Sequence, residues 1–439
     1  MFAVPRVIIW VLVYVVMVLA PVGLMLVPPA ASSRGFWSDV GIGAGFIGLS
    51  MMAVQFALTA RFRWIAGRVG MDGMLQFHRQ AGLVAFVFVL AHPVILILNS
   101  RRALAFLDPA VNLPRAVALG TAIVCLLLIV SLTLWRRAIR LPYEWWRLTH
   151  GLLAALVLLI GLAHTLMVGR FADEPWKRGL WVMVVGAAVL LLVQTRIVKP
   201  LLVLRRPWRV QGVRREAERL WTLTLAPDGH AGARFEAGQC FWVTIEDSPF
   251  SLQQHPFTVA SSATDPSRLE FTVKELGDYT SRIGQVRVGS RAWLEGPYGA
   301  FHFPRDPDAP VVMLAGGIGI TPFLSMLRTL RDEGRRHRWQ LVYGGRDLER
   351  IAFGEELAAI AAETGGRLVL LPEHPPPGWE GESGLMTNQS IGRLIREYEG
   401  PGTQYFVCGP DPMMDVVERS LIDHGVPLSR LHSERFNIA

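Results

Sequence analysis

The chain has 439 residues, of which 51% are hydrophobic and 18% are charged, and its mean hydropathy is +0.34. This composition excludes a disordered chain and argues against an ordinary soluble enzyme, because soluble domains carry about 25% charged residues. With so much apolar sequence, the net charge of +8 points to cytoplasmic loops beside anionic lipid rather than to nucleic acid binding.

Six apolar stretches precede residue 205, and each approaches the roughly 20 residues that a membrane-spanning helix requires. The first could be a secretory signal peptide, but its apolar run exceeds the usual h-region and favours a retained helix. Basic residues gather in the second and fourth connections and after the sixth stretch, so the positive-inside rule places both termini in the cytoplasm. The stretches lie at about 7–27, 38–60, 75–99, 115–134, 148–169 and 179–198.

Four histidines lie in these stretches as two equally spaced pairs. His78 and His92 are in the third stretch, and His150 and His164 are in the fifth. Fourteen residues return a helical side chain to nearly the same face, about 21 Å further along the axis. Because both stretches cross in the same direction, we expect His78 to face His150 on the cytoplasmic side and His92 to face His164 on the outer side. Two b-type haems, each between two axial imidazoles, fit this pattern.

Other roles exist for histidines inside a membrane. A single histidine can hydrogen bond between helices or serve a proton path. Zinc would need three or four clustered ligands rather than two separate layers. The repeated spacing on two parallel helices favours haem.

After Pro207 the pattern changes to short strands separated by turn residues. Strands are predicted at Leu220–Leu225, Cys240–Ile245, Phe257–Ser261 and Leu269–Lys274, which together suggest a small antiparallel barrel.

Three segments of this region, taken in order, indicate a flavin site. In the first, His255–Ser261, an aromatic residue followed by a hydroxyl residue can flank an isoalloxazine ring and hydrogen bond its edge. In the second, a short helix opened by Thr280 and Ser281 could bind a pyrophosphate at its N-terminus. In the third, Glu295–Gly299 is predicted to make a tight turn that closes the barrel. The candidate FAD-binding residues are His255, Pro256, Phe257, Thr258, Val259, Ala260, Ser261, Val273, Lys274, Gly277, Tyr279, Thr280 and Ser281.

Residues 310–439 alternate apolar strands with helical patterns, which indicates a parallel α/β sheet. The first strand runs into the glycine-rich segment Gly316–Pro322, where backbone could approach a pyrophosphate; a turn without function is the alternative. Arg346 follows the second strand in place of an acidic residue, which favours the 2′-phosphate of NADPH over NADH. Cys408 ends the last strand where a nicotinamide ring would arrive, with a structural turn as the competing interpretation. The candidate nucleotide-binding residues are Gly316, Gly317, Gly319, Thr321, Pro322, Arg346, Cys408, Gly409 and Pro410.

With these motifs in this order, the chain resembles the ferric reductase and NADPH oxidase superfamily. The resemblance implies FAD on the barrel, NADPH on the α/β domain, and a near-terminal aromatic residue, here Phe436, that covers the flavin. Cys408 and Phe436 would then act at the site of hydride transfer. The motifs are the two histidine pairs, HPFTVAS at His255–Ser261, GDYTS at Gly277–Ser281, GPYG at Gly296–Gly299, GGIGITP at Gly316–Pro322, CGP at Cys408–Pro410, and Glu434-Arg435-Phe436.

The predicted fold is an α-helical six-helix transmembrane bundle followed by an antiparallel β-barrel FAD domain and an α/β parallel-sheet nucleotide-binding domain. The expected boundaries are 1–205 for the haem domain, 206–305 for the FAD-binding barrel and 306–439 for the NADP-binding domain. We expect a multi-pass protein of the cell (inner) membrane, in contact with membrane lipid, with its FAD/NADP module in the cytoplasm.

The predicted function is electron transfer from NADPH, with NADH less favoured, through FAD and two b-type haems to an outer acceptor. Oxygen, giving superoxide, is the favoured acceptor; a ferric chelate or an extracytoplasmic protein partner is the alternative. Arg101, Arg102 and Arg170 could serve either acceptor or be ordinary interface residues. A transporter or channel with a regulatory nucleotide domain is the non-enzymatic alternative. We expect neither nucleic acid nor a calcium-binding module, since no EF-hand signature is present, and an obligate protein partner stays open.

Overall fold

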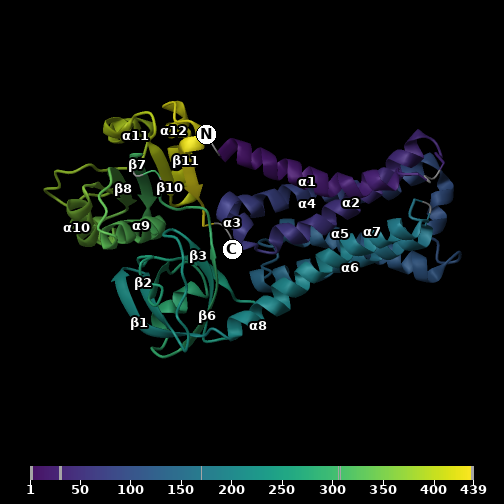
Figure 1. Cartoon of the computed structure of the whole chain (residues 1–439), viewed down its shortest axis with the longest axis horizontal. Coiled ribbons are helices and arrows are strands. Elements are labelled where there is room, and N and C mark those ends of the chain that lie inside the picture. The colour runs from purple at the N-terminus through teal and green to yellow at the C-terminus, as the bar shows by residue number, and fades with distance from the viewer. Residues whose placement is uncertain (1–2, 29–31, 170, 305, 307, 437–439) are drawn as a thin grey trace. The chain divides into compact units, whose positions relative to one another are not determined.

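The computed structural model describes residues 3–28, 32–169, 171–304, 306 and 308–436 (Figure 1). The chain divides into two compact units. The first consists of Val7–Arg61 and Gly73–Val198, and the second mainly of Phe62–Asp72 and the residues from Lys199 onward.

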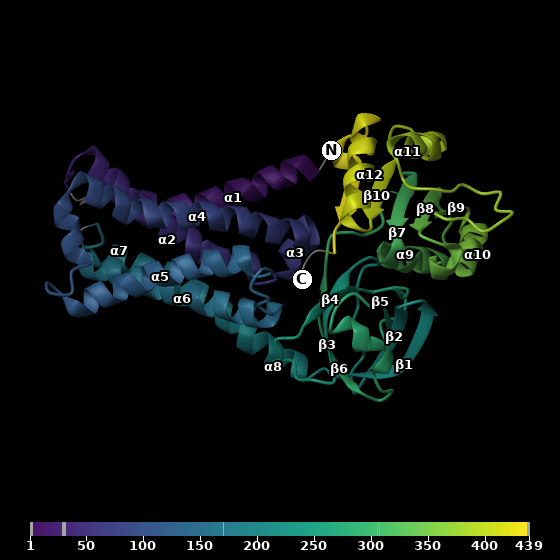
Figure 2. The same ribbon diagram turned by 180° about the vertical axis from the view of Figure 1, so that it is seen from behind.

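The first unit is a bundle of long helices that run alternately up and down (Figures 1 and 2). Six helices among the described residues are long and apolar enough to cross a membrane, which confirms the predicted multi-pass bundle. A π-helical turn, Gln194–Val198, follows the last of them. The six are α1 (Ala3–Met25), α2 (Phe36–Thr59), α4 (Met71–Asn99), α5 (Leu113–Trp135), α6 (Tyr143–Val168) and α7 (Pro175–Val193).

Helix α1 is packed into this bundle along its C-terminal half. Val18 and Met25 are almost fully buried, and the indole Nε1 of Trp181 donates to the sulfur of Met25 at 3.2 Å. The buried Nζ of Lys177 donates to the carbonyl oxygens of Met25 and Val27 at 2.9 and 2.8 Å. The last carbonyls of a helix have no partner within it, so this lysine satisfies the end of α1. These contacts join the end of α1 to α7.

The second unit begins with an antiparallel sheet whose strands follow the order β4-β3-β6-β1-β2-β5. An isolated bridge from Val259 to Phe271 joins the chain after β4 to β5, and so links the two edge strands. The short helices α3 (Arg63–Val69) and α8 (Lys199–Leu204) belong to this unit. The strands are β1 (Trp208–Ala217), β2 (Leu220–Pro227), β3 (Cys240–Ile245), β4 (His255–Thr258), β5 (Leu269–Lys274) and β6 (Arg291–Tyr298).

Two predictions about this sheet were wrong in detail. Strand β4 spans His255–Thr258 rather than Phe257–Ser261, because the chain leaves β3 after Thr258 to bridge β5. The segment Glu295–Tyr298 ends strand β6 instead of forming a turn: Glu295 pairs with Trp242 and Tyr298 with Cys240. The register shift between these pairs is a bulge, and a bulge accommodates a proline that a regular ladder would exclude.

The nucleotide-binding lobe is a parallel sheet in the order β11-β10-β7-β8-β9, with helices on both faces (Figure 1). Alternate residues of β7 point to opposite faces. Val311 and Met313 pack with α9 and α10, whereas Val312 and Leu314 pack with α11 and α12. This arrangement confirms the predicted α/β architecture. The elements are β7 (Val311–Gly316), α9 (Ile320–Asp332), β8 (Trp339–Gly345), α10 (Gly354–Thr364), β9 (Arg367–Pro372), α11 (Asn388–Ile395), β10 (Gln404–Cys408), α12 (Asp411–Asp423) and β11 (Leu431–Glu434).

Candidate functional site

The four membrane histidines meet in the two pairs that their spacing predicts. The ring centroids of His78 and His150 are 6.2 Å apart, and those of His92 and His164 are 6.1 Å apart. A bond from an imidazole nitrogen to a transition metal is about 2 Å long, so two rings on opposite sides of one iron have centroids roughly 6 Å apart. Each pair therefore has the separation that axial ligation of one iron requires. Within the described residues, no group of three or more His, Cys, Asp or Glu side chains could hold a metal.

In the His92/His164 pair, the ring of His92 is fixed by helix α2. Its Nδ1 lies 2.9 Å from the carbonyl oxygen of Gly41. A ring that donates from Nδ1 keeps the lone pair of Nε2 for a metal. A Cβ atom at Gly45 would lie 2.7 Å from the same Nδ1, so a glycine is needed there for α2 to approach the ring. The contact of Nδ1 with Gly41 and the close approach of α2 at Gly45 fit His92 as a haem ligand.

In the His78/His150 pair, the buried side-chain amide of Gln55 lies 2.6 Å from Nδ1 of His78. With its NH₂ group toward Nδ1, the amide can also accept from the backbone nitrogen of Gly82 at 3.0 Å. With its oxygen toward Nδ1, it accepts from the ring and leaves Nε2 of His78 for iron. The protein partners of the amide favour the first arrangement, whereas ligation of iron through Nε2 requires the second.

The second histidine of this pair, His150, also has a neighbour at Nδ1. The hydroxyl of Thr133 lies 3.5 Å from this nitrogen and donates to the carbonyl oxygen of Ile129 at 2.6 Å. The indole of Trp146 donates to the same hydroxyl at 3.2 Å. A hydroxyl that donates to a carbonyl can accept from the imidazole, so Nε2 of His150 is again the nitrogen available to a metal.

Next to the His92/His164 pair lies an arginine that the sequence analysis did not select. The guanidinium of Arg115 stacks on Phe106 with its Cζ atom 4.5 Å from the ring centroid, and Phe106 meets His164 edge-on at 6.1 Å. Arg115 donates from Nη2 to the carbonyl oxygen of Ala105 at 2.8 Å, while its buried Nε has no hydrogen-bond partner among the described residues. Such a group could pair with an anion, for example a haem propionate. Of the arginines predicted for this side, Arg101 and Arg102 are exposed, and Arg170 lies outside the described residues.

The flavin candidates present three stacked rings at one edge of the barrel. The ring of Tyr279 lies 4.1 Å from that of His255 and 6.5 Å from that of Phe257, with interplanar angles below 30°. Burial raises the pKa of the Tyr279 hydroxyl, so this group is neutral at physiological pH. Planar side chains in this arrangement suit the face of an isoalloxazine ring.

The other flavin candidates are less accessible. Val259 and Ala260 are fully buried and Val273 nearly so, whereas Lys274 is exposed, so the first three could reach a flavin only through their backbone. Around the predicted pyrophosphate turn, the hydroxyl of Thr280 accepts from the backbone nitrogens of Leu276 and Gly277 at 2.9 Å. The turn leads into a 3-10 helix over Thr280–Gln285. Pro256 lies on β4, Thr258 ends it, Ser261 follows it, and Ser281 lies in the 3-10 helix.

The nucleotide candidates gather at the carboxyl edge of the parallel sheet. The turn from β7 to α9 packs on the turn after β10: a Cβ atom at Gly319 would collide with the carbonyl oxygen of Cys408. Gly317 has a φ of +53°, a conformation that glycine adopts readily. Thr321 donates to the carbonyl oxygen of Ile318 at 3.1 Å, and Pro322 lies in the first turn of α9. Ligands of open α/β sheets bind at this edge, which agrees with a pyrophosphate at Gly316–Pro322.

Cys408 ends β10 between two neighbouring strands. It pairs in register with Ala315 of β7 and with Glu434 of β11. Burial, and then the charge of Glu434, raise the pKa of the Cys408 thiol, so the thiol stays protonated and neutral. A neutral thiol is compatible with a nicotinamide ring nearby. Gly409 and Pro410 complete the turn into α12.

Two other predicted residues lie at this side of the lobe. Arg346 is exposed directly after β8. Phe436 follows β11 and is 40% exposed, so its ring is accessible. The preceding residue, Arg435, donates to Glu418 at 2.7 Å and forms an ion pair with Asp415 at 2.8 Å. These contacts with α12 fix the backbone from which Phe436 extends.

Comparisons with known proteins match three successive parts of the chain, which correspond to the helical bundle, the barrel and the parallel-sheet lobe. A family model described as a ferric reductase like transmembrane component matches residues 44–161. An FAD-binding domain model matches residues 227–302, and an oxidoreductase NAD-binding domain model matches residues 313–419.

Curated relatives match about half of the chain. It is 30% identical over 207 residues to the ferredoxin reductase component of 3-ketosteroid-9-alpha-monooxygenase from Mycolicibacterium smegmatis, which covers 46% of this chain and 56% of that protein. It is 31% identical over 215 residues to ferredoxin–NADP reductase B from Sorangium cellulosum, which covers 46% of this chain and 86% of that protein. The chain thus spans little more than half the length of the first of these relatives.

A solved structure extends the likeness at the level of the fold. Flavohemoglobin from Malassezia yamatoensis, with bound FAD and heme, is 18% identical and has a TM-score of 0.50. The match covers 92% of this chain and 100% of that chain. At this identity, the likeness concerns the fold alone.

Proposed function

The chain belongs to the ferric reductase and NADPH oxidase type of membrane flavoprotein, and from this premise we propose that it moves electrons from NADPH across the membrane to oxygen. The proposed route is NADPH, FAD, the His78/His150 haem, the His92/His164 haem, and an acceptor on the outer side. The observation that carries this proposal is the pair of histidine layers with centroid separations of 6.2 and 6.1 Å.

FAD, when bound, would accept two electrons as a hydride and release them singly to haems that carry one each. The residues of the chain bind and orient the partners of this exchange. The glycine turn Gly316–Pro322 would hold the pyrophosphate, Arg346 the 2′-phosphate, and the neutral thiol of Cys408 the nicotinamide side. Phe436 would cover the flavin face until the nicotinamide displaces it.

In the membrane, the carbonyl oxygen of Gly41 would accept from Nδ1 of His92 and so leave its Nε2 for a metal, and Gln55 would do the same for His78 if its amide oxygen faces Nδ1. The four histidines would hold two haems, with two imidazoles for each, and the haems would supply single-electron transfer toward the acceptor. The guanidinium of Arg115 lies near His164 through Phe106, and its positive charge would stabilise a superoxide anion on this side, which is compatible with oxygen as the acceptor.

A ferric chelate is the second candidate acceptor. Arg101 and Arg102 lie exposed on the short helix Arg101–Phe106, where they could attract an anionic chelate without a closed pocket. We place this side outside the cell, and the FAD/NADP module in the cytoplasm, from the distribution of basic residues between the connections.

The test uses the purified full chain, loaded with FAD and haem, in proteoliposomes. NADPH is supplied to the side that carries the flavin module, and superoxide formation and ferric-chelate reduction are followed under identical conditions. We expect superoxide at a rate that accounts for NADPH oxidation. The protein would be a ferric reductase if reduction of the chelate is faster than superoxide formation in air and continues after oxygen is removed. NADPH oxidation with neither product would contradict transmembrane transfer.

A further inference from the structure

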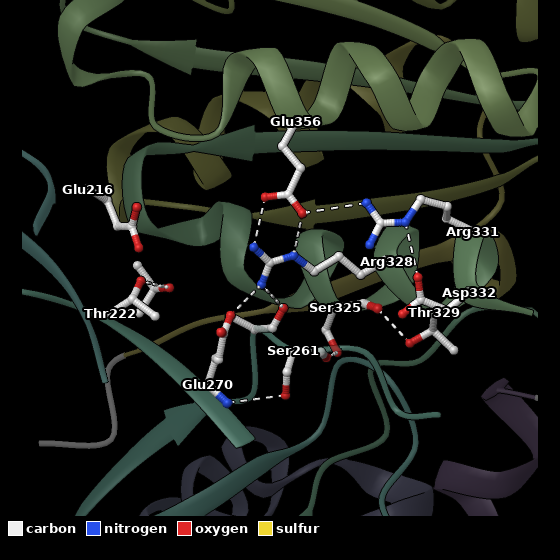
Figure 3. Close-up of polar contacts among 12 residues, drawn as sticks. Glu216, Thr222, Ser261, Glu270, Ser325, Arg328, Thr329, Arg331, Asp332 and Glu356 are labelled. Atoms are coloured by element: carbon white, nitrogen blue, oxygen red, sulfur yellow. Dashed lines mark hydrogen bonds and ion pairs between the residues drawn. The ribbon is translucent and has the colours of Figure 1, made fainter. Parts of the chain in front are cut away.

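One buried arginine joins the flavin barrel to the nucleotide-binding lobe. Arg328, on α9, is only 8% exposed. Its Nη1 donates to the carbonyl oxygen of Ala260 and to a carboxylate oxygen of Glu270, both at 2.9 Å and both in the barrel. Its Nε and Nη2 donate to the two carboxylate oxygens of Glu356 on α10, at 2.7 and 2.8 Å (Figure 3). A single guanidinium thus bonds to both parts of the module.

The barrel side of this contact continues the segment that carries the flavin candidates. Ala260 follows β4 by two residues, and Glu270 lies on β5. The backbone nitrogen of Glu270 donates to the hydroxyl of Ser261 at 3.1 Å. The lobe side belongs to the helix that starts directly after the glycine turn proposed to bind the nucleotide. Arg328 therefore lies between the barrel proposed to bind FAD, the hydride acceptor, and the lobe proposed to bind NADPH, the hydride donor.

Two neutral hydrogen bonds accompany Arg328 on the same face of α9. The hydroxyl of Ser325 donates to the carbonyl oxygen of Ser261 at 2.7 Å. The backbone nitrogen of Ala263 donates to the hydroxyl of Thr329 at 2.9 Å. Residues three and four apart on a helix share a face, so α9 is attached along residues 260–263. We call these contacts the Arg328 clamp.

The charges in the clamp are costly to bury, and this favours a geometric role. The side chains of Glu270 and Glu356 are 7% and 30% exposed. Replacing a buried ion pair by apolar side chains of similar volume is often neutral or stabilising. Stability alone therefore does not require an arginine here. A planar guanidinium with two hydrogen bonds to the barrel and two to α10 sets both the distance and the angle between the barrel and the lobe.

We propose that Arg328 is a positioning residue for hydride transfer, which sets the approach of the nicotinamide to the flavin through the clamp. This inference rests on the proposed function, in which NADPH reduces FAD. The hydride carries two electrons from the reduced nicotinamide to oxidised FAD, which takes up one proton from solvent to give reduced FAD and NADP⁺. Such a transfer needs reacting atoms about 3–3.5 Å apart, and a displacement of about 1 Å slows it about 100-fold.

The decisive experiment compares flavin reduction per bound FAD in the holoenzyme and three variants. Arg328→Lys keeps the charge but loses the two-sided fork. The triple variant Arg328→Met, Glu270→Gln, Glu356→Gln removes the fork and leaves no buried carboxylate unpaired. Arg335→Ala, which removes an exposed ion pair with Glu333 just beyond α9, is the matched control. Anaerobic stopped-flow at saturating NADPH gives the rate, and the charge-transfer absorbance between nicotinamide and flavin reports their stacking.

We expect Arg328→Lys and the triple variant to reduce bound flavin about 10- to 100-fold more slowly and to lose the charge-transfer absorbance. The dissociation constant of NADP⁺ should change less than about 2-fold, because the nucleotide's own contacts remain. Arg335→Ala should match the unmodified protein. If the flavin that stays bound is reduced at the normal rate in both Arg328 variants, the clamp is structural only and the proposal is overturned, even when FAD content falls. Failure of the unmodified holoenzyme to reduce its flavin would instead contradict the proposed function.

Discussion

Replacing Gly45 by alanine should remove or weaken the outer haem alone. The added Cβ atom would lie 2.7 Å from Nδ1 and 2.9 Å from Cγ of His92. Carbon atoms in ordinary contact are about 3.5–4.0 Å apart, so the ring must retreat by close to 1 Å. Overpacking of this kind costs about 1–3 kcal/mol, and losing the bond to Gly41 adds about 0.5–1.5 kcal/mol. Since about 1.4 kcal/mol is a tenfold change, haem affinity at this layer should fall about 10- to 100-fold or more.

The assay is the number of haems per protein, together with a redox titration of each haem. Gly43→Ala is the matched control, because a Cβ atom at Gly43, on the same helix, meets nothing within 4 Å. Both changes gain about 1 kcal/mol of helix propensity, which therefore cancels in the comparison. We expect one haem in the Gly45 variant and two in the Gly43 variant. Two haems with unchanged potentials in the Gly45 variant would refute the assignment of His92 as a ligand.

Three further outcomes are expected in the flavin and nucleotide module. Arg346→Ala should raise the Michaelis constant for NADPH about 10-fold, from a charged hydrogen bond of about 1.5–3 kcal/mol, and leave NADH unaffected; equal loss with both nucleotides, or the same effect in Arg350→Ala, would exclude this role. Phe436→Ser should improve the use of NADH relative to NADPH at unchanged haem content, because nicotinamide no longer displaces a ring; an unchanged ratio with lost FAD would make Phe436 a core residue. Burial raises the pKa of Glu356, but the hydrogen bonds and charge of Arg328 outweigh it and hold that pKa below its usual value. Stability from this carboxylate is present above about pH 4.3 and is lost as the pH falls further. The thermal midpoint, followed by flavin fluorescence, should therefore fall more steeply below pH 4.3 in the unmodified protein than in Glu356→Gln, and equal slopes would contradict this.

The histidine pairs were accessible to sequence reasoning because helical geometry is regular. A spacing of fourteen residues on two helices fixes both the face and the depth of each side chain. The neighbours of those rings were not accessible in the same way. Gln55 is a lone polar residue in an apolar stretch, and its partner depends on how α2 packs against α4. The glycines Gly41 and Gly45 were a visible signal of close helix approach, but not of which side chain they approach.

The sheets show a similar limit. Strands with a long apolar run, such as Val311–Gly316, were recognisable because buried parallel strands are uniformly hydrophobic. Strand β11, Leu431–Glu434, is short and mostly polar, and it was not predicted because it lies at the edge of its sheet. The Arg328 clamp was not predicted either, since its partners lie 58 and 28 residues away along the chain and only the fold brings them together.

The central claim is that electrons pass from NADPH through FAD to two haems that are each held by two histidines. The most direct measurement is the anaerobic absorbance spectrum of the purified holoenzyme before and after NADPH is added. The account predicts two six-coordinate haems per protein and sharp reduced bands that grow as the flavin is reduced and reoxidised. Absence of haem, or reduced flavin beside haems that stay oxidised, would contradict it.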